Sequence, residues 1–156
     1  MTLRRKYHSF TQIPLAVRWL MPITWVLLGL SRVIVLLLPF RKLAPLLGCR
    51  ADAPVLPLVA PQHLQRLRNL KQLIAITSHY CPWKANCFAQ AITAKVWLSW
   101  WGLPYTLFFG VARDPAQQLK AHAWLIAGPV VVCGGNSFAQ FTVVASYVSQ
   151  PFSANK

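Results

Sequence analysis

The most apolar stretch of the chain covers residues 17–38 and is interrupted by Arg32. About 20 apolar residues are enough to span a bilayer, but a central arginine costs about 2.5–3.5 kcal/mol on membrane-insertion scales. The pattern therefore favours a helix that is buried or lies on a membrane surface over one that spans the bilayer. A cleavable signal peptide fits poorly, because Arg41 and Lys42 follow the stretch where a small-residue cleavage site would stand.

Helical spacing of apolar residues marks two further segments. Leucine and isoleucine side chains recur every three or four positions across residues 62–78, with most basic residues on the other side, which predicts a helix. A second helix is expected to begin at Asn86 or Cys87 and to end at Trp100. Asn86 is a favourable N-cap residue, and Gly102 suits the position just beyond a helix end.

Patterns typical of β-strands begin after Pro104. Two glycine-containing turns, Gly128-Pro129 and Gly134-Gly135, separate the later segments. Helices followed by strands predict an α+β fold whose strands form an antiparallel meander. The four expected strands cover residues 105–111, 121–127, 130–133 and 141–147.

Prolines at positions 54, 57 and 61 predict a linker over residues 50–61. The chain then divides into an apolar, basic, helical N-terminal region with its linker, residues 1–61, and a core, residues 62–156. A length of 156 residues suits a single domain, so we expect the two parts to form one integrated unit.

The composition excludes some kinds of chemistry. The hydrophobic fraction is 56% and the charged fraction 12%, so the chain can bury a core. Asp52 and Asp114 are the only carboxylate side chains, which makes paired-acid glycosidase chemistry and a carboxylate magnesium site unlikely. The formal charge is +14, and the basic residues of the N-terminal part flank apolar runs rather than alternating with aromatics. We therefore expect an anionic membrane surface or an acidic peptide as a partner, and no nucleic acid.

The four cysteines do not form a recognisable disulfide or zinc pattern. The chain is large enough to bury a core without disulfides, and it contains no Cys-x-x-Cys or His-x-x-x-His pair. Reduced thiols in the cytoplasm are the simplest interpretation, with contact to a membrane surface as an addition that residues 17–38 would allow. No metal or other cofactor is expected.

Cys87 and His122 form the most informative pair of residues. Cys87 opens the second predicted helix, and His122 stands 35 positions later in a predicted strand. The positive end of a helix dipole and its unpaired N–H groups favour a thiolate and can stabilise an oxyanion. A histidine brought beside that thiol would act as its base. Packing is the ordinary role of a cysteine at a helix start; Cys81 is a rival nucleophile, disfavoured because Pro82 follows it.

Several short motifs, in this order and spacing, resemble one family. They are Asn86-Cys87-Phe88-Ala89-Gln90-Ala91, Trp101-Gly102-Leu103-Pro104, Leu107-Phe108-Phe109-Gly110-Val111 and Ala121-His122-Ala123-Trp124. Together they resemble the leader peptidases of lasso-peptide biosynthesis, which are transglutaminase-like cysteine proteases. Trp83, the Gly134-Gly135 turn, residues 141–144 and the apolar N-terminal half fit the same pattern.

The resemblance implies a papain-like core over residues 62–156, with a helix bearing the cysteine packed on an antiparallel sheet bearing the histidine. The implied activity is removal of the leader from a ribosomally made precursor peptide. A separate leader-binding recognition protein and a cyclase similar to asparagine synthetase are the implied partners. Two alternatives remain open: a non-enzymatic, basic, membrane-associated scaffold protein, and a transglutaminase-like acyltransferase.

By the same resemblance, Cys87 corresponds to the nucleophile and His122 to the base. The family often places an aspartate a short strand beyond the histidine, where this chain has Asn136, which could orient the imidazole. A backbone carbonyl or a water could serve instead, and Asp114 is a weaker candidate. We expect the substrate to contact Trp83, Gln90 and Trp124, although each could equally be a packing or capping residue.

Overall fold

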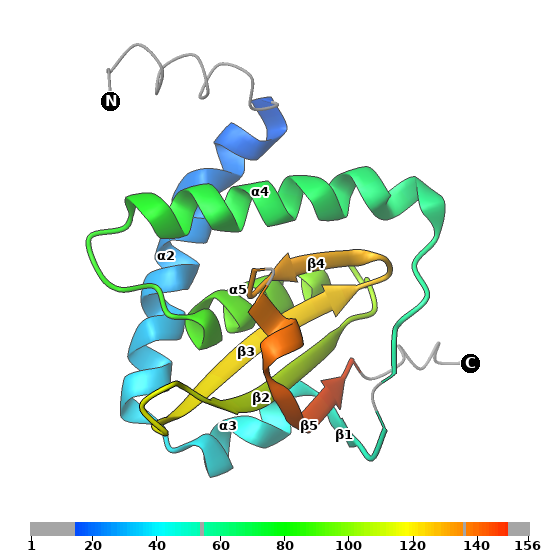
Figure 1. Ribbon diagram of the computed structural model, residues 1–156. Helices are drawn as coiled ribbons and strands as arrows, with labels where there is room; N and C mark the ends of the chain where they lie inside the picture. The colour runs from blue at the N-terminus through cyan, green and yellow to red at the C-terminus, as the bar shows by residue number, and fades with distance from the viewer. Residues whose placement is uncertain (1–14, 54, 136, 150–156) are drawn as a thin grey trace.

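The computed structural model describes residues 15–53, 55–135 and 137–149 of the chain (Figure 1). In these residues four α-helices accompany one five-stranded sheet, which confirms the α+β prediction. The helices are α2 (Leu15–Leu37), α3 (Phe40–Leu47), α4 (Leu64–Tyr80) and α5 (Cys87–Trp100), with short 3-10 helices η1 (Pro61–His63) and η2 (Ser137–Gln140). The strands are β1 (Cys49–Ala51), β2 (Thr106–Arg113), β3 (Leu119–Ala127), β4 (Val130–Cys133) and β5 (Thr142–Val148).

Local signals set the ends of α5. The side-chain oxygen of Asn86 accepts a hydrogen bond from the Ala89 N–H at 3.1 Å, which confirms the predicted N-cap. Gly102 follows the helix with a φ of 63°, a left-handed conformation that glycine adopts without a Cβ penalty. Helix α4 begins two residues later than predicted, since the chain from Pro61 to His63 forms a 3-10 helix instead.

The strand order is β1-β5-β2-β3-β4, and every neighbouring pair is antiparallel. Strands β2, β3 and β4 form the predicted meander. The meander prediction is wrong for β5, which pairs with β2 rather than β4. The linker prediction is wrong at its start, because Arg50 and Ala51 belong to β1 and pair with Tyr147 and Ser146.

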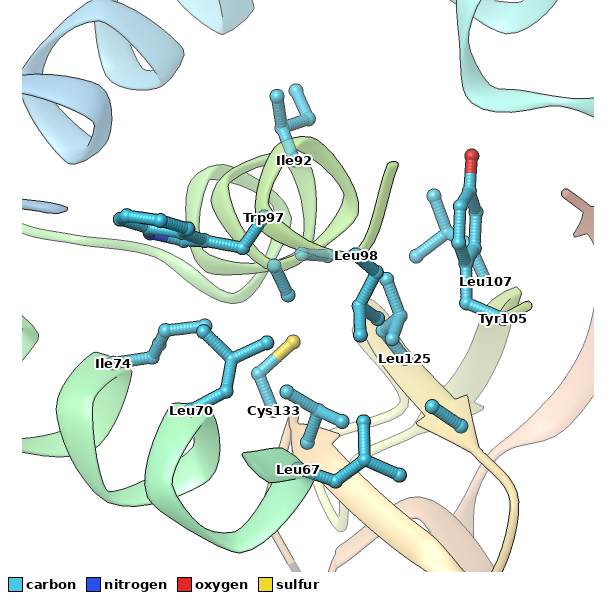
Figure 2. Packing of buried hydrophobic residues seen from close by; sticks show 14 of the residues in the cluster. Leu67, Leu70, Ile74, Ile92, Trp97, Leu98, Tyr105, Leu107, Leu125 and Cys133 are labelled. Carbon is cyan, nitrogen blue, oxygen red and sulfur yellow. The ribbon is translucent and has the colours of Figure 1, made fainter. Parts of the chain in front are cut away.

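The hydrophobic core lies between the sheet and the helices α4 and α5 (Figure 2). Leucine and isoleucine side chains of these helices share one buried cluster with inner side chains of β2 and β3, and those at its centre are at most 1% exposed. The residues at the centre of this contact are Leu67, Leu70, Ile74, Leu98, Leu107 and Leu125. Burial of this size holds α5 and α4 against the sheet.

The N-terminal segment belongs to the same packing. Helix α2 forms one side of the molecule in Figure 1 and packs against α4 and α5. The helix over residues 17–37 is long and apolar enough to cross a membrane, judged by length and composition alone. Val17 of α2 and Leu47 of α3 are part of the core, so residues from both sides of position 61 contribute to it.

Candidate active site

Cys87 is the first residue of α5, and its side chain is half-buried against the core. The Asn86 side chain binds the N–H of Ala89, and the Asn86 carbonyl accepts the N–H of Gln90 at 3.1 Å. The N–H groups of Cys87 and Phe88 are therefore the donors that remain in the first turn. The start of α5 thus combines a thiol, two backbone donors and the positive end of the helix dipole.

His122 lies in β3 and makes one short hydrogen bond. Its Nε2 atom is 2.6 Å from the carbonyl oxygen of Gly134. A carbonyl oxygen can only accept, so Nε2 carries the proton and donates it. In the neutral ring this leaves Nδ1 unprotonated, which is the state that a general base requires.

Aromatic side chains hold the His122 ring. Trp124 stacks on it with ring centroids 6.0 Å apart, and Phe141 lies 4.9 Å away. Trp124 is buried and stacks in turn on Phe108. Gly110 is paired with His122, and a Cβ atom there would lie 2.8 Å from both Phe141 and Trp124, so a larger residue would displace these rings.

Cys87 and His122 lie on opposite sides of β3. Helix α5 packs on the face of β3 that carries Ala123 and Leu125, and Cys87 packs against the same core. His122 and Trp124 alternate with those residues and face the other way, toward the side that η2 crosses in Figure 1. Within the described residues no hydrogen bond joins the Cys87 thiol to the His122 ring, so their pairing stays a prediction.

One edge of β3 is only partly paired. In the described chain β4 pairs only with residues 125–127 of β3, which leaves the edge of β3 open beside His122. Gly134 stands at this edge with a φ of 98°, and a Cβ atom there would collide with the Cβ of Trp124. Glycine is therefore required at the residue whose carbonyl orients His122.

Cys133, the residue before Gly134, lies close to Cys87. Its sulfur is buried among the side chains of α4 and α5 (Figure 2). Desolvation by burial is the main cause that raises the pKa of the Cys133 thiol to about 12, and a charge on Cys87 contributes to the same rise. His122 borders this segment through its hydrogen bond to Gly134, and the charge of Cys87 acts on the neighbouring Cys133 thiol.

Gln90 lies one helical turn beyond Cys87. Its side-chain amide donates to the Ala85 carbonyl at 2.9 Å, which ties the loop before Cys87 to the helix. Gln90 also lines a pocket of about 350 Å³ between α4 and β4, together with Cys133 and Gly134. This pocket adjoins Gly134, whose carbonyl accepts the hydrogen bond from His122.

Trp83 packs against α2 instead of facing open solvent. Its ring lies 4.7 Å from that of Trp25 and over Gly29, where an added Cβ atom would be 3.2 Å away. Its indole N–H is buried and has no hydrogen-bond partner among the described residues. The predicted substrate contacts of Trp83, Gln90 and Trp124 stay predictions.

Asn136 and Asp114 are the two side chains considered for orienting the His122 ring. Asn136 lies outside the described residues. Asp114 lies in the turn between β2 and β3, where it accepts the Gln118 N–H at 2.9 Å and pairs with Lys120 at 3.3 Å. The hydrogen bond from Gln118 is the main cause that lowers the pKa of Asp114. In the described residues the group bonded to the His122 ring is the Gly134 carbonyl, a main-chain atom.

Comparison with known proteins identifies the superfamily. The model of the transglutaminase-like superfamily matches residues 34–146, a span that includes α5 and the sheet from β2 into β5. The chain belongs to this superfamily, and its membership supports an activity of the cysteine-protease or acyltransferase type. No curated protein and no solved structure gives a significant match.

Proposed function

We propose that the chain is a cysteine peptidase that removes the leader from a ribosomally synthesised lasso-peptide precursor before macrolactam closure. The observation that carries this proposal is the 2.6 Å hydrogen bond between His122 Nε2–H and the Gly134 carbonyl. It leaves Nδ1 of the neutral ring unprotonated and therefore able to accept a proton. Superfamily membership supports chemistry through a thiol nucleophile.

In the first step Nδ1 of His122 takes the proton of Cys87, and the thiolate attacks the carbonyl carbon of the scissile peptide bond. The N–H groups of Cys87 and Phe88 are placed to donate to the resulting oxyanion. The imidazolium then gives its proton to the departing amine. The C–N bond breaks, the core peptide leaves with a free N-terminus, and the leader remains on Cys87 as a thioester.

In the second step Nδ1 takes a proton from water, and the hydroxide attacks the thioester carbon. The C–S bond breaks, the leader leaves as a carboxylate, and Cys87 recovers its proton from the imidazolium. An amine in place of water would make the same site an acyltransferase. The mass of the leader product distinguishes hydrolysis from transfer.

The chemistry requires the Cys87 sulfur and His122 Nδ1 to come within roughly 3–4 Å. Catalytic hydrogen bonds are often long or poorly aligned without substrate and tighten in the complex. The proposal therefore requires His122 and Cys87 to approach each other when substrate binds.

The leader as substrate is supported by the resemblance of the motifs around Cys87 and His122 to lasso-peptide leader peptidases. The partners of the proposal are a separate leader-binding protein and a cyclase similar to asparagine synthetase. Peptide recognition by the partner would leave this chain to supply the cleavage chemistry.

The test combines the purified full-length chain with the precursor peptide and leader-binding protein sought in neighbouring genes. Mass spectrometry measures the rate of leader release. The variants Cys87→Ala and His122→Ala should each lose roughly 10³-fold or more of the rate, because nucleophile and base act as one unit. Circular dichroism checks that both variants keep the fold.

Cys49→Ala provides the matched control, because Cys49 is an exposed free thiol on β1, outside the described contacts of the site. This variant should release the leader at the wild-type rate. Cleavage by Cys87→Ala at the wild-type rate would refute the proposal. A leader product joined to an amine would replace hydrolysis with acyl transfer.

A further inference from the structure

Helix α2 has two faces with different surroundings. Its inner face consists of Val17, Thr24, Leu28 and Ser31, which are all buried and recur at intervals of seven, four and three residues. This spacing places them in one stripe along the helix. The stripe packs against α4 and α5.

Buried hydrogen bonds fix this inner face to α5. The indole N–H of Trp97 donates to Thr24 Oγ1 at 3.1 Å, and the hydroxyls of Ser31 and Thr93 are 3.1 Å apart. Thr24 and Ser31 lie two helical turns apart, so α2 is held along much of its length. The inner face of α2 is therefore an integral part of the folded domain.

The outer face of α2 is apolar as well. The exposed residues Trp19, Val26, Leu30, Val33 and Leu37 form a stripe on the side opposite the inner face. Trp19 is 80% exposed and Leu37 is 75% exposed. A helix with apolar residues on all sides is ordinarily buried on all sides. The exposed outer face of α2 is therefore expected to contact a membrane or another molecule.

The basic residues around this surface indicate that its binding partner is anionic. Helices α2 and α3 contain no acidic residue, and Arg41 and Lys42 are exposed in the first turn of α3. Arg50 follows on β1, also exposed. Basic residues beside an apolar helix face, with tryptophan on that face, are typical of helices bound to anionic membrane interfaces.

We propose that the outer face of α2 lies in the plane of an anionic bilayer surface, with its inner face still packed on α4 and α5. A spanning orientation would carry the attached helices into hydrocarbon. Arg66, Arg68 and Lys71 of α4 are exposed and charged, which makes that orientation costly. This inference does not depend on the peptidase activity.

Vesicle co-sedimentation with the full-length chain tests the inference. The two probes are vesicles of phosphatidylcholine alone and vesicles of phosphatidylcholine with about 30% phosphatidylglycerol. The wild-type chain should bind the anionic vesicles at least ~10-fold more tightly than the neutral ones, and added salt should weaken the binding. A wash at alkaline pH should release it, which a spanning helix would resist.

The triple variant Val26→Gln/Leu30→Gln/Val33→Gln removes apolar surface from the outer face alone. It should keep the fold by circular dichroism and lose at least ~10-fold of the vesicle binding. The matched control is Leu56→Gln/Leu58→Gln, since these residues are 64% and 95% exposed on the segment after β1. That variant should bind as the wild type does.

Three outcomes would overturn the inference. The first is a wild-type chain that stays in the supernatant with anionic vesicles. The second is vesicle binding that the outer-face variant retains. The third is a wild-type dimer that the outer-face variant abolishes while vesicle binding is absent, which would assign the surface to a second copy of the chain.

Discussion

The His122 ring is oriented by a main-chain oxygen, the carbonyl of Gly134. A carbonyl fixes the tautomer and the ring plane as a carboxylate would, but it carries no charge to balance an imidazolium. In the proposed mechanism the thiolate of Cys87 therefore supplies the balancing charge. The turn residue Asp114 is held instead by Gln118 and Lys120.

The burial of Cys133 predicts how the free energy of unfolding changes with pH. Burial raises the pKa of its thiol from 9.0 to about 12. Between these values the unfolded chain releases the proton while the folded chain keeps it, so the free energy of unfolding should fall as pH rises. The contribution of this group falls by at most about 1.36 kcal/mol per pH unit.

Denaturant unfolding at pH 8, 9 and 10 measures this slope. Cys133→Ala should show a shallower fall than the wild type, because its buried thiol is gone. Cys49→Ala, which removes an exposed thiol, should keep the wild-type slope. Equal slopes for the wild type and Cys133→Ala would contradict the assignment.

At the scale of elements, α5 is the centre of the fold. It carries Cys87 at its start, packs on β3 and β4 through its inner side, and binds α2 through Trp97 and Thr93. Phe88, the residue after Cys87, contacts Phe40 of α3 and Phe109 of β2. The position of the Cys87 thiol therefore depends on contacts of α5 with α2, α3 and the sheet.

The contact between α2 and α5 gives the second prediction. Thr24→Val keeps the side-chain shape but leaves the buried Trp97 N–H without its acceptor. An unsatisfied buried donor costs about 1–3 kcal/mol, so the free energy of unfolding should fall by that amount. Denaturant unfolding at neutral pH measures the change.

Thr142→Val is the matched control, because Thr142 is exposed at the start of β5 and the same change there should cost little. The double variant Thr24→Val/Trp97→Phe removes both partners and should lose less than the sum of the two single changes. Additive losses would show that the Thr24–Trp97 bond does not contribute to stability.

Elements with local signals were predictable, and those fixed by distant contacts were not. Asn86 and Gly102 mark the ends of α5 within the sequence itself, so its bounds agree with the prediction. Strand β1 has only three residues and exists because β5 pairs with it, which no local pattern shows. The same holds for the place of β5 beside β2 and for the Gly134 carbonyl, since any residue offers a carbonyl.

At the scale of the whole molecule, the N-terminal helices contribute to the same core as the sheet. Val17 and Leu47 enter the core, and Phe40 reaches the aromatic side chains beside Cys87. A bilayer on the outer face of α2 would therefore hold the candidate site at a fixed distance from the membrane. The formal charge of +14 would favour an anionic surface.

The most direct test of the central claim, that Cys87 and His122 act as a nucleophile and its base, is the rate of alkylation by iodoacetamide at pH 6. Peptide mass mapping follows each cysteine in the native chain. Cys87 should react at least ~10-fold faster than exposed Cys49, and His122→Ala should reduce its rate to that of Cys49. A Cys87 that reacts no faster than Cys49, or whose fast reaction survives His122→Ala, would contradict the account.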